Sequence, residues 1–161
     1  MPALPAAPGA VPSAAPDATA QRLGYAGLIP FVLGALLVWL VRADVHAYVA
    51  LALSAYAAVV LSFLGGIHWG LVMRQTNPPT NFPTNLPTRV LWWGVVPSLV
   101  AWPAAVMPPD AGLVLQGLML LVCYGVDRRL YPPLGAAGWL TLRFRLSAVA
   151  ALACFIGAAG S

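Results

Sequence analysis

Five long apolar stretches constrain this chain more than any other feature of its sequence. Only 7% of the residues are charged. A helix needs about 20 apolar residues to cross the hydrocarbon core of a bilayer, which is about 30 Å thick. The sequence therefore predicts an all-α integral membrane protein in which residues 22–161 form a bundle of about five transmembrane helices. The predicted spans are residues 23–41, 47–73, 90–107, 111–126 and 146–159.

The segment before the first span, residues 1–21, consists mostly of alanine and proline and carries one charged side chain, Asp17. It has neither the basic start and apolar centre of a secretory signal peptide nor the arginines of a transit peptide. Its low complexity and frequent proline predict a disordered tail.

The arginines fall almost entirely on one side of a five-span path. Seven of the eight lie at span ends that this path brings together, and Arg42 lies on the other side. Under the positive-inside rule, this asymmetry predicts a cytoplasmic N-terminus and a C-terminus outside. The last two spans are short, so Arg128 and Arg145 are expected to snorkel toward the headgroups unless the bilayer thins locally. No basic cluster lies outside the span ends, so nucleic acid is not an expected partner.

A row of small residues runs along the second predicted span at every fourth position. Such rows let helix backbones approach closely in a membrane, where lipid offers no hydrophobic drive for association. The row therefore predicts helix packing and places the second span at the centre of the bundle. Its members are Ala50, Ser54, Ala58, Ser62, Gly66 and Gly70.

A histidine interrupts the apolar pattern near the end of the same span, in the run LSFLGGIHWG. His68 lies eighteen residues, or five helical turns, after Ala50, and the face that they share consists mostly of small residues. We therefore expect His68 to face the bundle interior, where an ionisable side chain is by default a candidate functional site.

Asp127 ends the fourth span on the same side of the membrane. It shares a helical face with Gln116 and Cys123, so a contact between His68 and Asp127 is geometrically possible. The alternative is structural: Asp127 pairs with Arg143 or Arg145, and His68 only hydrogen-bonds a backbone carbonyl.

The prolines predict two further local features. Pro97 removes a backbone hydrogen bond within the third span and predicts a helix kink. Residues 76–87 repeat the pattern TNxP three times and predict an extended linker, with peptide docking as the alternative.

No catalytic motif appears in the sequence. The chain has no glutamate and no lysine, and it lacks the HExxH, GxSxG and phosphate-loop patterns, so an enzyme is not favoured. The two cysteines lie within apolar segments and are expected to be buried thiols. No cofactor and no metal are predicted, because a metal would require His68, Asp127 and Cys123 to converge.

Several ordered motifs resemble a known family. GLIPF at residues 27–31, SFLGGIHWG at 62–70, VVPSLVAW at 95–102, VDR at 126–128 and LRFRL at 142–146 are similar to the bacterial and mitochondrial family related to transmembrane protein 69, domain of unknown function 3429. The resemblance implies about five helices in a bacterial inner (plasma) membrane. It marks as motif positions Gly65, Gly66, His68, Trp69, Pro97, Asp127, Arg128 and Arg143.

Three functional hypotheses follow. The first is an accessory or assembly component, whose partners are the lipid bilayer and other membrane proteins. The second is a carrier of a small solute or of protons that uses His68 and Asp127, with Arg128 and Arg143 as further candidate functional residues. The third is a quinone- or haem-associated membrane protein in which His68 and Trp69 border the cofactor.

Overall fold

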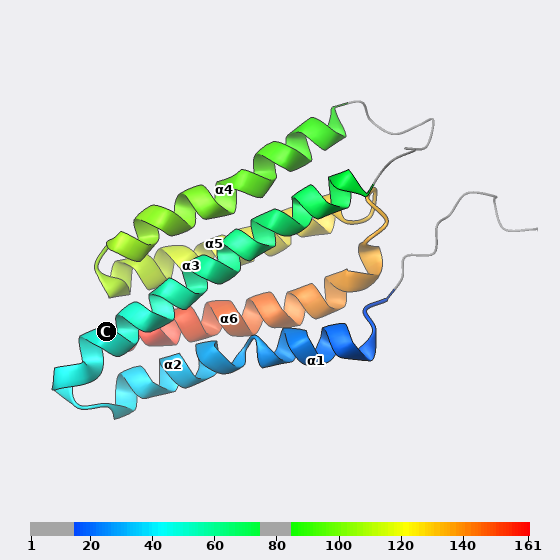
Figure 1. Cartoon of the computed structure of the whole chain (residues 1–161). Coiled ribbons are helices and arrows are strands. Elements are labelled where there is room, and N and C mark those ends of the chain that lie inside the picture. Colours follow the sequence, from blue (N-terminus) through cyan, green and yellow to red (C-terminus); the bar gives the residue numbers. More distant parts are fainter. Residues whose placement is uncertain (1–14, 75–84) are drawn as a thin grey trace, which may run out of the picture.

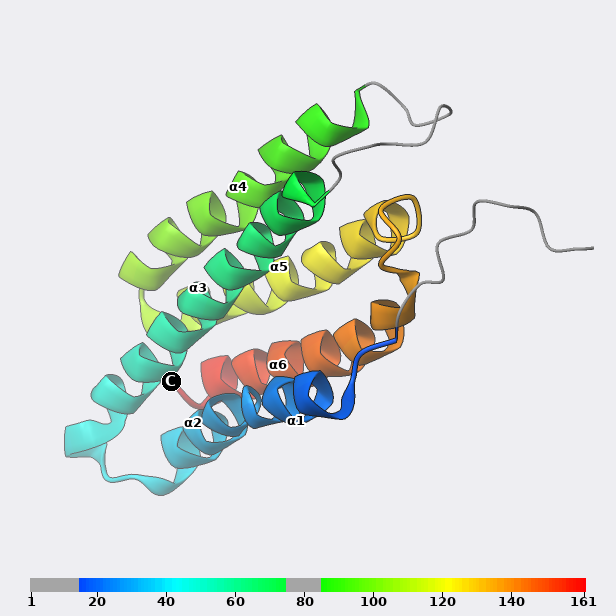
Figure 2. The same cartoon turned by 45° about the vertical axis from the view of Figure 1, so that its right-hand side comes forward.

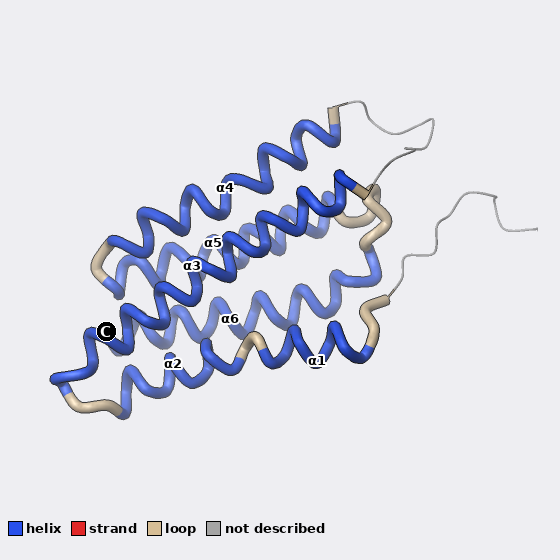
Figure 3. Tube along the Cα trace, viewed as in Figure 1, coloured by secondary structure: helices blue, strands red, loops and turns tan. Residues whose placement is uncertain are grey.

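The computed structural model describes residues 15–74 and 85–161, and in that part of the chain it contains helices and no strands (Figures 1 and 3). Five segments are long and apolar enough to cross a membrane, so the predicted all-α membrane fold is confirmed. One span combines α1 and α2, and the last combines the short 3₁₀ helix η1 with α6. The elements are α1 (Ala18–Ala26), α2 (Ile29–Leu40), α3 (Ala43–Met73), α4 (Leu86–Val106), α5 (Pro109–Leu130), η1 (Ala137–Trp139) and α6 (Leu140–Gly160).

The first span begins before its predicted start and is interrupted near its middle. The carboxylate of Asp17 accepts a hydrogen bond from the backbone N–H of Ala20 at 2.7 Å and caps α1, so residues 18–21 are helical and not part of a tail. The interruption falls just before Pro30, which lies in the first turn of α2. A proline ring clashes with the carbonyl four residues earlier and the residue lacks a backbone N–H, and both effects favour an interruption at this point. The predicted tail otherwise lies outside the described residues, apart from residues 15–17.

The longest helix, α3, is the centre of the bundle and packs against α2, α4, α5 and α6 (Figures 1 and 2). Its 31 residues extend about 46 Å at 1.5 Å per residue. Its buried face includes Ala50, Ser54, Leu61, Gly65 and His68. This is the face that helical spacing predicted for His68.

Only part of the predicted packing row lies in the bundle. Ala50 and Ser54 are buried and Ala58 is half-buried, but Ser62, Gly66 and Gly70 are exposed. Successive positions of such a row rotate by about 40° around the helix, so its second half turns away from the neighbours that its first half contacts. Within this chain the row therefore packs as far as Ala58, and packing at Ser62, Gly66 and Gly70 stays a prediction.

The glycine that brings α3 close to α4 is Gly65. A Cβ at this position would collide with the backbone carbonyl of Gly94, and it would lie 3.7 Å from the ring of Pro97. Trp69 covers Gly94 from the next turn of α3. Pro97 is thus buried at this helix contact, and α4 continues through it without interruption.

The last span starts earlier than predicted, and its long helix, α6, starts six residues before the predicted start. The prediction began at Leu146, whereas α6 begins at Leu140. Arg143 and Arg145 therefore lie inside the helix. Because these arginines lower the local hydropathy, the apolar pattern alone placed the start too late.

One end of the bundle contains most of the charge. The start of α1, the end of α3, the start of α4, the end of α5 and the start of α6 meet at the right-hand end in Figure 1. Seven arginines belong to these segments, whereas Arg42 lies between α2 and α3 at the opposite end. Large apolar side chains cover much of the outer surface, including Leu40, Trp92, Trp102 and Val106, as expected for helices that face lipid.

Candidate functional site

Three polar side chains from three different helices meet in the interior near the arginine-rich end. His68 comes from the last turns of α3, Asp127 from the last turn of α5, and Arg143 from the first turn of α6. Their exposed fractions are 1%, 0% and 7%. We refer to these three residues as the His–Asp–Arg cluster.

Asp127 and Arg143 form a buried ion pair. Arg143 donates from Nε to Asp127 Oδ2 at 2.9 Å, and its Nη2 donates to the same oxygen. The antiparallel arrangement of α5 and α6 makes this contact possible, because it brings the end of one helix beside the start of the next. The pair satisfies one oxygen of the carboxylate.

The second carboxylate oxygen faces the histidine. Asp127 Oδ1 lies 3.0 Å from Nε2 of His68, within ion-pair distance. Within the described residues neither atom makes a directed hydrogen bond, so the two face each other without being aligned as donor and acceptor. The carboxylate therefore lies between the guanidinium of Arg143 and the imidazole of His68.

The hydrogen bond of the other ring nitrogen identifies the tautomer of His68. Nδ1 of His68 donates to the carbonyl oxygen of Leu64 at 3.1 Å, and because a carbonyl only accepts, Nδ1 has the proton. Without a further proton, Nε2 would present its lone pair to the carboxylate of Asp127. A proton on Nε2 or on Oδ1 removes that repulsion, and since Arg143 is always charged, the cluster then has a net charge of +1.

Two further groups border the cluster. Tyr131 lies one turn after Asp127 and its ring centroid is 6.0 Å from that of His68. Burial raises the pKa of Tyr131 to about 12, an effect that Arg143 partly offsets, so its phenol is neutral at physiological pH. Cys123 is buried one turn before Asp127 on the same face of α5.

A second polar contact lies deeper in the bundle. Gln116 on α5 donates from Nε2 to the backbone carbonyl of Ser54 at 3.1 Å, and it accepts from the Ser54 hydroxyl at 3.3 Å. Gln116, Cys123 and Asp127 therefore form the buried polar face that their spacing predicted. This contact ties α3 to α5 near the middle of both helices.

The candidate residues thus separate into two groups. His68, Asp127 and Arg143 converge, whereas Arg128 is exposed and lies outside the cluster. Both interpretations of Asp127 describe part of the geometry, because its two oxygens contact different partners. In the described part of the chain, no group of three or more His, Cys, Asp or Glu side chains is arranged to hold a metal ion.

Sequence reasoning missed Tyr131 and the contacts at the other end of α6. His46 donates from Nε2 to the carbonyl of Gly160 at 2.6 Å, and Trp39 donates to the carbonyl of Ile156 at 3.1 Å. The carbonyl of Gly160 is one of the last four of α6, which the end of a helix leaves unpaired. The four-residue spacing between Asp127 and Tyr131 could have indicated the tyrosine, but no local signal links His46 to Gly160.

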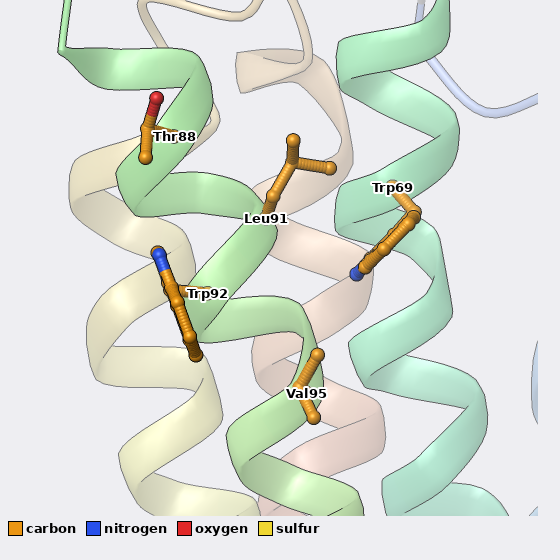
Figure 4. Close-up of a pocket in the computed structure, with 5 residues that line it drawn as sticks. All are labelled: Trp69, Thr88, Leu91, Trp92 and Val95. Carbon is orange, nitrogen blue, oxygen red and sulfur yellow. The ribbon is translucent and has the colours of Figure 1, made fainter.

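A shallow apolar groove of about 290 Å³ lies between α3 and α4 near the arginine-rich end (Figure 4). The indole of Trp69 points toward α4, where the side chains of Leu91 and Val95 lie beside it. Thr88 and Trp92 complete the lining. The groove is open to the surface, so it belongs to the outer face of the bundle and not to the His–Asp–Arg cluster.

Fold and site together define a multi-pass, all-helical transmembrane protein with an ionic cluster shared by three helices. The chain belongs to the family described as "Protein of unknown function (DUF3429)", whose model matches residues 16–159. This confirms the family that the motifs indicated.

The chain is also similar to transmembrane protein 69 of Xenopus tropicalis, to which it is 38% identical over 109 residues. The match covers 65% of this chain and 41% of the relative, so the chain spans less than half of that protein's length. No solved structure matches the chain significantly.

Proposed function

We propose that this protein is an accessory or assembly component of a membrane complex, and that a partner's transmembrane helix packs along the exposed face of α3. The observation that carries the proposal is the free space at Gly66 and Gly70, where an added Cβ would meet no atom within 4 Å. By contrast, Gly65, Gly94 and Gly112 lie against a neighbouring helix of the chain. Close helix approach is the ordinary use of small residues at this spacing.

The groove of Figure 4 extends the proposed contact face. Trp69 lies three residues after Gly66 and one residue before Gly70, so it borders both the small-residue row and the groove. A helix seated on Ser62, Gly66 and Gly70 could therefore place side chains against Trp69 and Trp92. Aromatic side chains beside a close helix contact each bury a large apolar area in such an interface.

We assign the protein to the bacterial inner membrane, with the arginine-rich end in the cytoplasm. Seven arginines at one end against one at the other support this orientation under the positive-inside rule. The N-terminus then lies in the cytoplasm and the C-terminus outside.

Mild-detergent purification of three leucine variants tests the proposed contact. Gly66→Leu and Gly70→Leu should fold normally, because nothing occupies the space beside them, but should lose a partner that the wild-type chain retains. Gly125→Leu is the matched control, because Gly125 is an exposed glycine on α5 with the same free space. A wild-type chain that purifies without any partner, or equal retention by all three variants, would overturn the proposal.

Proton transfer is a second candidate function, and the contact between His68 and Asp127 favours it. A proton can reside on either side of the 3.0 Å contact, with the positive charge of Arg143 and the neutral Tyr131 and Cys123 beside it. Reconstituted liposomes with an internal pH-sensitive dye test this function. Proton flux that His68→Gln abolishes and that Arg128→Gln leaves unchanged would support it, whereas equal flux in His68→Gln and wild type would exclude it.

The hypothesis of a quinone or haem role combined His68 with Trp69. His68 is buried against Asp127, whereas Trp69 covers Gly94 and borders the surface groove. The two side chains therefore lie in different environments, and no observation on the described residues favours a shared cofactor site.

A further inference from the structure

Two arginines, two residues apart at the start of α6, have opposite environments. Positions two apart on an α-helix differ by about 200° in direction. Arg143 points into the bundle, where Asp127 neutralises it. Arg145 is exposed on the outer face of the same span.

Arg145 lies deeper than the membrane surface. The exposed indole of Trp139, a residue type enriched at membrane interfaces, lies six residues earlier, which is about 9 Å along the axis. Helical side chains tilt toward the N-terminus of their helix, so the guanidinium of Arg145 is directed back toward the arginine-rich end. Its charge therefore reaches the level of the lipid headgroups from a backbone position within the hydrocarbon.

Within the described residues, Arg145 has no carboxylate partner. Asp127 pairs with His68 and Arg143, and Asp17 caps α1. Asp44, which pairs with Arg42, and Asp110, in the first turn of α5, lie at the opposite end of the bundle. The hydrogen-bond partner of Arg145 is instead the hydroxyl of Tyr25 on α1, which accepts from Nη1 at 3.3 Å. A cation at the edge of the hydrocarbon without a counterion is unfavourable.

The neighbouring residues on α1 complete a cradle for an anion. The hydroxyl of Tyr25 accepts from Arg145 and keeps its own proton, which it can donate to an oxygen. Arg22 lies three residues before Tyr25, on the same face of α1, and is exposed. Leu146 packs 3.0 Å from the position of a Cβ on Gly24, so the two helices that supply these groups are held in contact.

From this geometry we infer that Arg145, Tyr25 and Arg22 bind the phosphate of an anionic phospholipid at the outer face between α1 and α6. Two guanidinium groups and one hydroxyl match the acceptor oxygens of a phosphodiester. The exposed apolar side chain of Leu23, next to Arg22 on α1, can contact the acyl chains. The source of the phosphate is a lipid because Arg145 projects from a surface that faces the hydrocarbon.

Native mass spectrometry of the purified full chain, with phosphatidylglycerol or phosphatidylcholine added, tests this site. The wild-type chain should retain phosphatidylglycerol in preference to phosphatidylcholine. Arg145→Gln should weaken that retention about fivefold. Arg145→Lys should keep most of it, and Tyr25→Phe should lose a smaller part. An excess of inorganic phosphate should not displace the lipid.

Arg129→Gln is the matched control, since Arg129 is an exposed arginine at the same end of the bundle. Retention by this variant should equal that of the wild type. Thermal midpoints measured alongside show that each variant is folded. The inference is wrong if Arg129→Gln weakens the retention of phosphatidylglycerol as much as Arg145→Gln does, if both lipids bind equally, or if inorganic phosphate displaces the lipid.

Discussion

At the scale of single residues, Asp127 is the buried carboxylate that connects the His–Asp–Arg cluster. Its two oxygens serve different partners, Arg143 on one side and His68 on the other. A buried charge that loses its counterion is strongly destabilising, whereas exposed ion pairs contribute little. The carboxylate therefore matters to the stability of the bundle whatever its function.

Asp127→Asn should lower the free energy of unfolding by about 3–5 kcal/mol, because Arg143 is left buried without a counterion. Denaturation of the detergent-solubilised chain measures the loss. Asp44→Asn removes an exposed ion pair with Arg42 and should cost less than about 1 kcal/mol. Similar losses in the two variants would contradict a stabilising role for the buried pair.

Tyr131 provides a pH-dependent test of the same region. Burial raises its pKa in the folded chain to about 12, whereas the unfolded chain releases the same proton near pH 10. Burial of the neutral phenol therefore makes its full contribution to the free energy of unfolding below pH 10. About 2 kcal/mol of that free energy is lost as the pH rises toward 12, because the unfolded chain then releases the proton more readily. Unfolding measured across this range should show a loss that is smaller by about this amount in Tyr131→Phe than in the wild type, and an unchanged loss in Tyr48→Phe, whose ring is exposed.

Part of the cluster was predictable from the sequence. Helical spacing alone placed His68 on a small-residue face and Asp127 on a polar face, and both faces are buried. The simultaneous contact of Asp127 with His68 and Arg143 was not predictable, because it depends on how far α6 extends toward the arginine-rich end. The hydropathy pattern predicts that the last helix starts after Arg143, although this residue lies inside the helix.

At the scale of the helices, glycines determine which pairs come close, and neighbouring glycines differ. Gly65 lies against the backbone of Gly94 on α4, whereas Gly66 has open space beside it. The sequence predicted the small-residue row but not the point at which it leaves the interface. Gly66 lies sixteen residues after Ala50, which places it about 160° around the helix.

The substitutions Gly65→Ala and Gly66→Ala should therefore differ clearly in their effect on the free energy of unfolding. Gly65→Ala forces α3 and α4 apart and should cost about 1–3 kcal/mol, as other overpacked contacts do. Gly66→Ala should change the free energy of unfolding by less than about 0.5 kcal/mol. Thermal unfolding in one detergent compares them directly. Equal midpoints would show that the close approach at Gly94 contributes nothing to stability.

At the scale of the whole molecule, seven arginines lie at one end of the bundle, as the five-span path predicted. Five apolar stretches were sufficient to predict the fold, because each is long enough to cross the hydrocarbon and each is bounded by polar or helix-breaking residues. The TNxP repeat could not be compared with the structure, since residues 75–84 lie outside its described part. Of that repeat, Asn85, Leu86 and Pro87 are described, at the start of α4.

The proposed orientation predicts opposite accessibilities for two introduced cysteines. Ala43→Cys, at the start of α3, should react with a membrane-impermeant thiol reagent added to intact spheroplasts. Pro132→Cys, in the turn after α5, should react only after the membrane is opened. Both positions are exposed, and the native Cys123 and Cys154 are buried, so the background is low. The reverse pattern would invert the assigned topology.

The pairing of Arg143 with Asp127 also affects how the chain enters a membrane during synthesis. The two residues are separated by only 16 positions, on consecutive antiparallel helices. A charged side chain within an isolated span opposes insertion, and an opposite charge on the adjacent span relieves that opposition. The last two helices are therefore expected to leave the translocon as one hairpin, and a chain that stops after α5 would leave Asp127 unneutralised by Arg143.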